Sequence, residues 1–249
     1  MKTTGNTILI TGGTSGIGIG LAQCFQQAGN TVIVAGRRTD LLEKIEAEHL
    51  GLRTLLLDVT DPASIAQARQ TVAARYPEVN VLVNNAGIML PEKLLDADAG
   101  SLQIAEDTVS TNLLGPIRMV YALLPHLAAK DEAVVINVSS GLAFVPLPIT
   151  PTYNATKAAI HSFTEALRVQ VAGTAIQVIE LIPPAVRTTL MGQQDSEQAM
   201  PLEEFLTETM ALLRTRPDAK EILVENVKFL RSAATDGTYD SVLAMLSGH

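Results

Sequence analysis

Short runs of apolar residues alternate along the chain with segments in which apolar residues recur every three or four positions. The runs are rich in Val, Ile and Leu, as in strands of a parallel sheet that is covered on both faces. They span Thr7–Thr11, Thr31–Ala35, Thr54–Leu57, Val79–Val83, Val134–Val138 and Ile176–Leu181. Between them, the pattern predicts helices over Thr39–Glu48, Pro62–Tyr76, Thr108–Ala129 and Thr152–Ala172. This alternation indicates right-handed crossovers and a doubly wound α/β sheet.

Composition limits the class of protein. A length of 249 residues, 47% of them hydrophobic, is enough for one domain over residues 1–249 with a large core. The sequence has neither an apolar run long enough to span a bilayer nor an N-terminal signal-peptide pattern. Its one cysteine, Cys24, excludes an internal disulfide framework. The formal net charge of −8 argues against a nucleic-acid surface. We therefore expect a cytoplasmic protein with no membrane or nucleic-acid partner.

A glycine-rich turn follows the first predicted strand and precedes an amphipathic stretch that ends near Ala28. Strand, glycine turn and helix start are the setting of a dinucleotide-binding loop. Gly12 suits the tight turn, Gly16 lets the backbone approach a pyrophosphate, and Gly18 lets the helix pack close to the strand. The pyrophosphate would lie on the N–H groups of the helix N-terminus. The spacing is G-x-x-x-G-x-G, and the expected cofactor contacts here are Gly12, Thr14, Ser15, Gly16, Ile17 and Gly18.

Tyr153 and Lys157 lie four residues apart in a predicted helix, and Tyr153 comes thirteen residues after Ser140. Side chains at positions i and i+4 lie one above the other on the same helix face. Many such pairs are ordinary neighbours on a helix surface. An ammonium close to a phenol nevertheless favours the phenolate, because opposite charge stabilises the ionised form. The pair therefore indicates a tyrosine that can exchange a proton near neutral pH.

These motifs occur together in the order typical of one family. The chain carries Thr11-Gly-Gly-Thr-Ser-Gly-Ile-Gly18, Asn84-Asn-Ala-Gly87, Asn112, Ser139-Ser140 and Tyr153-x-x-x-Lys157. Over at least residues 5–190 it resembles a short-chain dehydrogenase/reductase. Ile182-Pro-Pro-Ala-Val-Arg-Thr-Thr189 and the run Glu221–Glu225 resemble, more narrowly, the oxidoreductases named after the D-alanyl-lipoteichoic acid operon. That narrower group carries no firm substrate.

The resemblance implies an NAD(P)-dependent enzyme that interconverts a carbonyl and an alcohol. Tyr153 would exchange a proton with the substrate oxygen, and Ser140 would donate a hydrogen bond to that oxygen. Ser139 is the alternative, but the spacing to Tyr153 favours Ser140. Lys157 would lower the pKa of the tyrosine and hold the nicotinamide ribose. Asn112, within the long predicted helix, would hold a water that links the lysine to solvent.

The end of the second predicted strand bears on the choice between NAD and NADP. NAD-preferring proteins usually have an acidic residue there, which bonds the ribose 2′-hydroxyl. Gly36 occupies that position and offers no carboxylate. Arg37, with Arg38 beside it, could pair with a 2′-phosphate through its planar fork of donors. Alternatively, both arginines simply begin a solvated helix. We expect NADP(H) to be preferred over NAD(H).

Other cofactor contacts follow from the resemblance. Asp58, which precedes Val59, would bond the adenine amino group through its side chain. Thr188 would bond the nicotinamide carboxamide, near a segment that Pro184 stiffens where the broad family commonly has glycine. Small residues after the fourth strand would let the backbone lie against the cofactor. The remaining expected contacts are Asn85, Ala86, Gly87, Tyr153, Lys157, Pro183 and Val186.

The loops after the strand ends would form the substrate pocket. They are largely apolar and comprise Ile88–Leu90, Leu142–Ile149 and Ala185–Met191. No arginine or lysine lies between Ser140 and Thr156 to clamp an anionic group, and we interpret Arg187 as a solvated loop residue. A medium-sized apolar ketone, aldehyde or alcohol is the expected substrate. By resemblance, residues 189–213 are a mobile lid, whose stretch Gln193–Gln198 is polar.

The C-terminal part and the assembly complete the expected fold. Family members commonly have a seventh strand, but Pro217–Ser232 and Tyr239–Leu246 predict helices here. We therefore expect six strands in the order 3-2-1-4-5-6. By resemblance, the helices Thr108–Ala129 and Thr152–Ala172 would form a four-helix bundle in a homodimer or homotetramer.

The histidines do not indicate a metal site. His49, His126 and His249 form no ligand cluster along the sequence. His161 lies on the helix face of Tyr153 and Lys157, where we expect it to support the reacting residues or to lie in an interface rather than to be catalytic. We predict no metal site.

Two other kinds of protein compete with an oxidoreductase. A cofactor-binding sensor or regulator would keep the fold and do little chemistry, but all four reacting positions are intact. An epimerase-like relative would hold NAD tightly and usually has a larger C-terminal substrate domain, for which this chain has no room.

Overall fold

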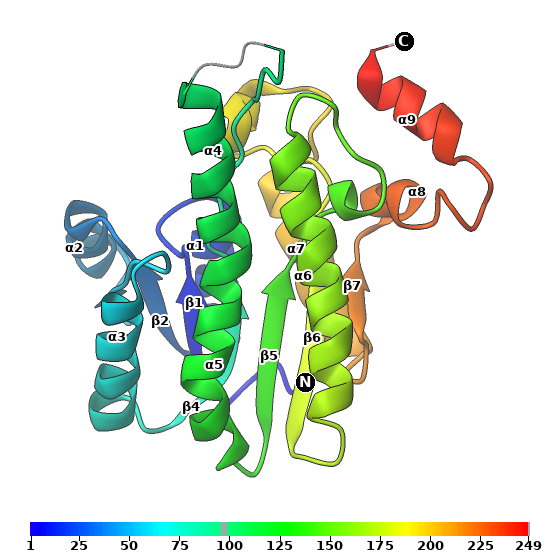
Figure 1. Cartoon of the computed structure of the whole chain (residues 1–249). Helices are drawn as coiled ribbons and strands as arrows, with labels where there is room; N and C mark the ends of the chain where they lie inside the picture. Colours follow the sequence, from blue (N-terminus) through cyan, green and yellow to red (C-terminus); the bar gives the residue numbers. More distant parts are fainter. Residues whose placement is uncertain (96–98, 249) are drawn as a thin grey trace.

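One parallel sheet forms the centre of the protein (Figure 1). The structure is a computed structural model that describes residues 1–95 and 99–248. Within these residues the sheet has seven strands in the order β3-β2-β1-β4-β5-β6-β7. Their bounds are β1 Thr7–Thr11, β2 Thr31–Gly36, β3 Arg53–Leu56, β4 Val79–Asn84, β5 Ala133–Val138, β6 Ile176–Ile182 and β7 Glu221–Leu223. The strand order reverses between β1 and β4, which creates a crevice at the carboxyl ends of the strands.

Helices cover both faces of the sheet (Figure 1). One face carries α1 Gly16–Gln27, α2 Thr39–Glu48 and α7 Leu202–Thr215. The other carries α3 Pro62–Arg75, α5 Gly115–Ala128 and α6 Pro151–Gln170, and α4 Ala99–Val109 leads into α5. The short α8 Lys228–Arg231 and α9 Tyr239–Ser247 follow β7. None of the helices in the described part of the chain has the length and apolar character needed to cross a bilayer.

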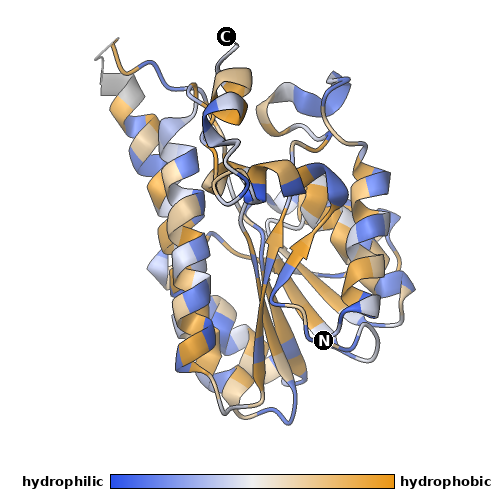
Figure 2. Ribbon diagram, turned by 90° about the vertical axis from the view of Figure 1, so that its right-hand side faces the viewer, coloured by the Kyte–Doolittle hydropathy of each residue, from blue (hydrophilic) through white to orange (hydrophobic). Residues whose placement is uncertain are grey.

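Alternation of side chains along each strand divides the core into two clusters. On β1, Ile8 and Ile10 point to the face of α1 and α7, whereas Leu9 points to the face of α3 and α5. Phe25 and Phe205 fill the first cluster. Figure 2 shows the strands as predominantly hydrophobic and the surrounding helices as mixed. Burial on both faces explains why most strands appear in the sequence as continuous apolar runs.

The predicted doubly wound α/β fold is confirmed, but the prediction of six strands is wrong. Glu221–Leu223 pairs with β6 as a seventh parallel strand. Of the helix predicted over Pro217–Ser232, only Lys228–Arg231 is α-helical. A three-residue edge strand is too short to show a period of two. Pairing with β6 and burial of Ile222 in the core outweigh the local helical preference.

Helix α7 forms the second half of the predicted lid and packs on the core. Phe205, Leu206 and Leu213 are buried, and the helix packs on α1. The two helices approach closely, because a Cβ at Gly20 would lie 2.5 Å from Leu206 Cδ1. Residues 202–213 therefore belong to the layer of helices that packs on one face of the sheet.

Phe205→Ala should test this packing. Removing a fully buried phenyl ring leaves a cavity and costs roughly 3–5 kcal/mol. Phe229→Ala is the matched control, because Phe229 is 46% exposed and its loss should cost far less. Urea unfolding followed by circular dichroism measures both. Equal and small losses would show that α7 is not held by the core.

Candidate active site

A cleft of about 1160 Å³ lies across the carboxyl ends of the strands. At one end its lining includes Arg37 and Asp58, which follow β2 and β3 in the chain. At the other end it includes Ser140 and Pro183, which follow β5 and β6. Ligands of doubly wound folds bind at this place, where the strand order reverses. Typical ligand pockets have volumes of roughly 300–1000 Å³. The cleft therefore has room for a dinucleotide and a small second molecule.

The cleft brings together most residues that the sequence predicts for the site. Its lining contains the predicted contacts Gly12, Thr14, Ser15, Gly16, Ile17, Arg37, Arg38, Asp58, Val59, Asn85, Ala86, Gly87, Ser140, Tyr153, Lys157, Pro183, Val186 and Thr188. Gly18 and Asn112 are buried behind this lining instead. Leu90, predicted for the substrate pocket, is 42% exposed and lies outside the lining.

The glycine loop between β1 and α1 is pressed against the loop after β4. Gly12 has a φ of 63°, and a Cβ there would lie 2.6 Å from Ala86 Cα. A Cβ at Gly18 would lie 2.3 Å from the Gly12 carbonyl oxygen. Asn85 donates from Nδ2 to the carbonyl oxygens of Thr11 and Gly12, at 3.1 and 3.0 Å. Only residues without Cβ permit this approach, which directs the first N–H groups of α1 towards the cleft.

The end of β2 carries no acidic side chain, and any side chain there would have to displace Thr14. A Cβ at Gly36 would lie 2.7 Å from Thr14 Cγ2. Arg37, the next residue, is exposed and lines the cleft. Burial alone would raise the pKa of Asp58, but hydrogen bonds from Thr60 and the charge of Arg37 hold it below its ordinary value. This end of the cleft therefore combines two exposed guanidinium groups, Arg37 and Arg38, with one ionised carboxylate.

Ser140, Tyr153 and Lys157 meet where β5 ends beneath α6. All three side chains are buried, and Tyr153 forms a side-chain hydrogen bond with Ser140. Lys157 Nζ lies 5.5 Å from the centroid of the Tyr153 ring and donates to the Val138 carbonyl oxygen at 2.8 Å. Ser139 is buried too, but its hydroxyl has no hydrogen-bond partner among the described residues. The geometry thus brings Ser140 rather than Ser139 to the phenol.

Asn112 lies in a π turn, Ser110–Leu114, that interrupts the predicted long helix between α4 and α5. Its Oδ1 accepts from Ile88 N and its Nδ2 donates to Ile88 O, both at 2.8 Å. Nδ2 also lies 3.4 Å from Thr156 Oγ1 on α6. Asn112 therefore ties the loop after β4 to the helix that carries Tyr153. Single π turns inside helices often occur at functional sites.

The comparisons with known proteins agree with this geometry. The family model for short chain dehydrogenases matches residues 6–199. The chain belongs to this family. It is 36% identical over 252 residues to the uncharacterized oxidoreductase DltE of Bacillus subtilis, covering 99% of this chain and 98% of that one. These matches confirm the resemblance to short-chain dehydrogenases and to DltE.

Two further similar proteins are named for an activity. The NADP-dependent 3-hydroxy acid dehydrogenase YdfG of Salmonella typhi is 35% identical over 184 residues, 73% of each chain. A serine dehydrogenase solved in complex with NADP⁺ is 28% identical, with a TM-score of 0.77 over 87% of this chain and 92% of that one. The present chain is thus an NAD(P)-dependent dehydrogenase/reductase. Solved structures with this fold hold NADP or NAD.

Burial dominates the ionisation of the reacting groups in this short-chain dehydrogenase. It raises the pKa of Tyr153 to about 12, although the Ser140 hydrogen bond acts in the opposite direction. Burial also lowers the pKa of Lys157 to about 8, against the charge of Glu180. The lowering of the tyrosine pKa by Lys157 stays a prediction, and burial acts against it. The ammonium is itself destabilised by the same dry surroundings.

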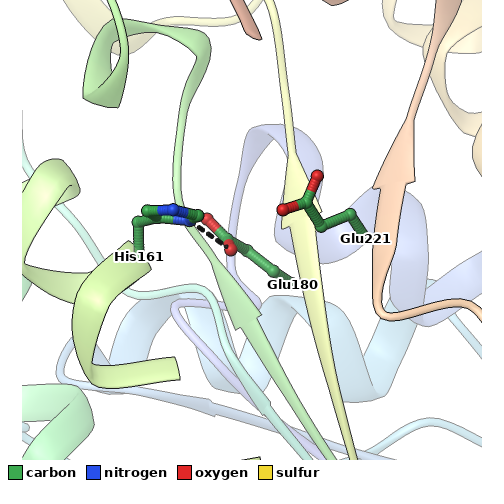
Figure 3. A group of neighbouring side chains, drawn as sticks. All are labelled: His161, Glu180 and Glu221. Atoms are coloured by element: carbon green, nitrogen blue, oxygen red, sulfur yellow. Dashed lines mark hydrogen bonds and ion pairs between the residues drawn. The ribbon is translucent and has the colours of Figure 1, made fainter. Parts of the chain in front are cut away.

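The sequence reasoning missed two buried glutamates near α6. Glu92 accepts from Thr152 N and Thr152 Oγ1, at 2.9 and 2.6 Å, and so caps the start of the helix that carries Tyr153. Glu180, fully buried on β6, accepts from His161 Nδ1 at 2.8 Å (Figure 3). The supporting role predicted for His161 agrees with this contact. A charged residue inside the apolar run Ile176–Leu181 was the available signal.

His161, Glu180 and Glu221 also form a group with the ligand types of a metal site. Their ligand atoms lie within 4.8 Å of one another. However, Arg231 donates to both oxygens of Glu221, at 2.9 and 3.0 Å, and its positive charge opposes a metal cation. We therefore interpret the group as a network of ionic and hydrogen bonds. The absence of a metal site stays a prediction.

The C-terminal part of the chain contributes a wall that the sequence did not reveal. Asn226, Phe229, Leu230, Met245 and Leu246 line the cleft beside the loops after β5 and β6. No motif marks these residues, because only the tertiary fold brings α8 and α9 to the cleft.

Arg187 also differs from its interpretation as a solvated residue. It is half-buried, and its Nε donates to the carbonyl oxygens of Ser196 and Ala199, at 2.8 and 3.0 Å. The guanidinium holds the following loop in place, because it satisfies carbonyl groups that no regular element satisfies.

Gly12→Ala should weaken both the fold and cofactor binding. The left-handed backbone alone costs about 1–2 kcal/mol, and the contact with Ala86 adds to it. Gly29→Ala is the matched control, because Gly29 has a φ of 88° and no atom near an added Cβ. Urea unfolding and NADPH fluorescence titration measure the two effects. Normal NADPH affinity in the folded Gly12→Ala protein would contradict the role of the loop.

Proposed function

We propose that the protein is an NADP(H)-dependent oxidoreductase that interconverts a medium-sized apolar ketone or aldehyde and the corresponding alcohol. The observation that carries this proposal is the buried Tyr153, hydrogen-bonded to Ser140 and close to Lys157, in the same cleft as the glycine loop. Such a reaction needs an acid that protonates the substrate oxygen, a second hydrogen-bond donor to that oxygen and a positive charge near the acid. The phenol, the serine and the lysine fill these roles in turn.

Each residue of the reacting centre has its own role in the reduction. Bound NADP(H) supplies the hydride. Tyr153 donates its phenolic proton to the carbonyl oxygen as that oxygen gains negative charge, and Ser140 donates a hydrogen bond to it. A Tyr153 pKa of about 12 keeps the phenol protonated at neutral pH. The Lys157 ammonium then stabilises the phenolate that remains. Oxidation of the alcohol follows the same steps in reverse.

The preference for NADP(H) rests on the end of β2. Gly36 provides no acidic side chain, which is the usual partner of a ribose 2′-hydroxyl, and Thr14 lies against this position. Arg37 and Arg38 are exposed at the same edge and suit a 2′-phosphate. The relative YdfG is named as NADP-dependent, which supports the same choice.

The other end of the cleft favours an apolar substrate. Met89, Leu142, Leu147, Leu190 and Phe229 are among its lining residues. Within the described residues, the cations of the lining are Arg37, Arg38 and Lys157, and Arg187 is occupied by loop carbonyls. Lys157 lies beside Tyr153 but already bonds the Val138 carbonyl oxygen. Among the described lining residues, no further cation lies there to bind a carboxylate. We propose that the substrate differs in this respect from the acids for which YdfG and serine dehydrogenase are named.

The loop after β6 has the features of a lid. Leu190 and Gln193 line the cleft, while Val186 pairs with Met200 and Arg187 bonds the loop carbonyls. We propose that residues 189–200 move over the substrate, while the contacts of Val186 and Arg187 keep the start of the loop in place. The following residues, 202–213, stay packed on α1.

The outer faces of α5 and α6 fit the proposed homodimer or homotetramer. Tyr121 on α5 and Val169 on α6 are 78% and 75% exposed. Large apolar side chains that remain exposed on neighbouring helices suit an interface between copies.

Tyr153→Phe, measured beside the wild-type protein on a panel of apolar ketones and aldehydes, tests the reaction. We expect NADPH-selective turnover that falls by roughly 10²–10⁴-fold without the phenol. Tyr76→Phe removes the same hydroxyl at the end of α3, outside the cleft lining, and should keep full activity. Cofactor binding without turnover, unchanged by Tyr153→Phe, would instead indicate a sensor or regulator.

Arg37→Ala tests the cofactor preference. A hydrogen bond to a charged group contributes about 1.5–3 kcal/mol, so the KM for NADPH should rise by roughly 10–150-fold. The KM for NADH should change little, because NADH has no 2′-phosphate. Arg69→Ala, at an exposed position on α3, controls for net charge. Equal changes for both cofactors would contradict the assignment of Arg37.

A further inference from the structure

A row of polar side chains crosses the apolar sheet beneath α6. Asn84, Asn137, Glu180 and Glu221 are register partners on the successive strands β4, β5, β6 and β7. Register partners in a parallel sheet point to the same face, here that of α6. The first three are buried, and Glu180 is 0% exposed. Polar groups in such a place are costly unless they are bonded, so the row needs a physical reason.

Hydrogen bonds link the two asparagines of this row, although Asn84 Oδ1 has no partner among the described residues. Glu180 bonds to α6 instead. Asn84 donates to Asn137 Oδ1, and Asn137 donates to Thr164 Oγ1 on α6, both at 2.9 Å. Glu180 Oε2 accepts from His161 Nδ1 at 2.8 Å. Glu180 Oε1 has no hydrogen-bond partner among the described residues. One oxygen of a buried carboxylate is therefore free to act on a nearby cation.

Lys157 is that cation. It precedes His161 by one turn of α6, and its Nζ bonds the carbonyl oxygen of Val138. Val138 follows Asn137, the register partner of Glu180. The ammonium and the carboxylate thus lie under the same helix at the ends of adjacent strands. The charge of Glu180 raises the pKa of Lys157 and so opposes the lowering by burial.

We propose that Glu180 is a positioning residue of this active site, whose buried carboxylate keeps Lys157 in its charged form while His161 holds the carboxylate in place. Only the catalytic consequence rests on the proposed function, because the pairing of charges exists without turnover. The charged member of the buried row, Glu180, then acts on the ammonium that the reaction requires.

The other charged groups around Glu180 balance one another. On α6, Glu165 lies 3.8 Å from His161 Nε2 and is largely exposed, and Tyr153 remains a neutral phenol at neutral pH. On β7 and α8, Glu221 and Arg231 form a bidentate ion pair. Arg231 also lies 4.5 Å from the centroid of the Phe144 ring, whose edge packs on His161. Arg231 bonds to Glu221, and the charge of Glu180 acts on it only as one of several carboxylates.

The sign of the effect follows from these charges. Lys157 is charged below its pKa and neutral above it. Without the carboxylate, burial acts alone, and the lysine loses its proton at a lower pH. If the reduction needs the ammonium, the alkaline limb of kcat/KM moves to lower pH by the same amount.

Glu180→Gln, a neutral side chain of the same shape, tests this inference. The pKa of Lys157 can be followed by NMR titration of protein labelled with ¹³C-lysine, with Lys157→Met for assignment. We expect the proton affinity of Lys157 to fall tenfold or more. Glu165→Gln removes an equal charge beside the same histidine, but at an exposed position, and should leave Lys157 unchanged. Identical titration of Lys157 in Glu180→Gln and the wild-type protein would overturn the proposal.

Arg231→Gln gives a second test if Glu180→Gln does not fold. Loss of the guanidinium leaves Glu221 uncompensated and adds net negative charge near Lys157. The proton affinity of the lysine should then rise with no loss of protein stability in urea unfolding. General loosening would raise it only together with a loss of stability, because water would reach the buried ammonium. An unchanged or reduced affinity counts against the proposal. A shifted lysine in a protein without turnover would overturn the proposed function alone, and turnover with an unshifted lysine would overturn this inference alone.

Discussion

A lysine ammonium held out of water beneath α6 is the constraint on which the arrangement of the site depends. Burying a charge is expensive unless it is paired and hydrogen-bonded. Lys157 has one carbonyl partner, the face of a tyrosine ring at 5.5 Å and a buried carboxylate nearby. These contacts do not fully offset the burial, because the pKa of Lys157 still falls to about 8. The site therefore keeps its lysine near the point at which the charge is lost.

The surrounding fold supports this unfavourable placement with rigid connections. Asn112 joins the loop after β4 to the π turn, and Glu92 joins the end of that loop to the start of α6. Both connections position the helix that carries Tyr153 and Lys157, without contact between either residue and the phenol. Strain and unfavourable burial at a site persist only when the neighbouring structure holds the groups in place. These two buried polar side chains thus help to hold the reacting groups.

The parts of the site that could be predicted from the sequence are local in the chain. The glycine loop needs three glycines within seven residues, and Tyr153 and Lys157 need only one helical turn between them. Both were predictable because the backbone geometry follows directly from their spacing. Strand β7 and the groups around Glu180 could not be predicted in the same way. A three-residue edge strand has no period of its own, and the register that aligns Asn84, Asn137, Glu180 and Glu221 exists only in the assembled sheet. The wall formed by α8 and α9 has the same origin.

The two ends of the cleft differ in how they can gain binding energy. The end at β2 has exposed guanidinium groups, so binding there depends on charge and weakens with salt. The end at Tyr153 is largely apolar and offers a serine and a phenol as donors, so selection there depends on shape and on one polar oxygen. Apolar pockets discriminate weakly between substrates of similar size, by about 1–3 kcal/mol for a methylene group. Under the proposed function, the cofactor end supplies affinity that does not depend on the substrate, and the reacting end selects only weakly among apolar carbonyl compounds. Narrower selectivity has to come from the loop at residues 189–200 and from α9, the walls whose side chains are least constrained by the core.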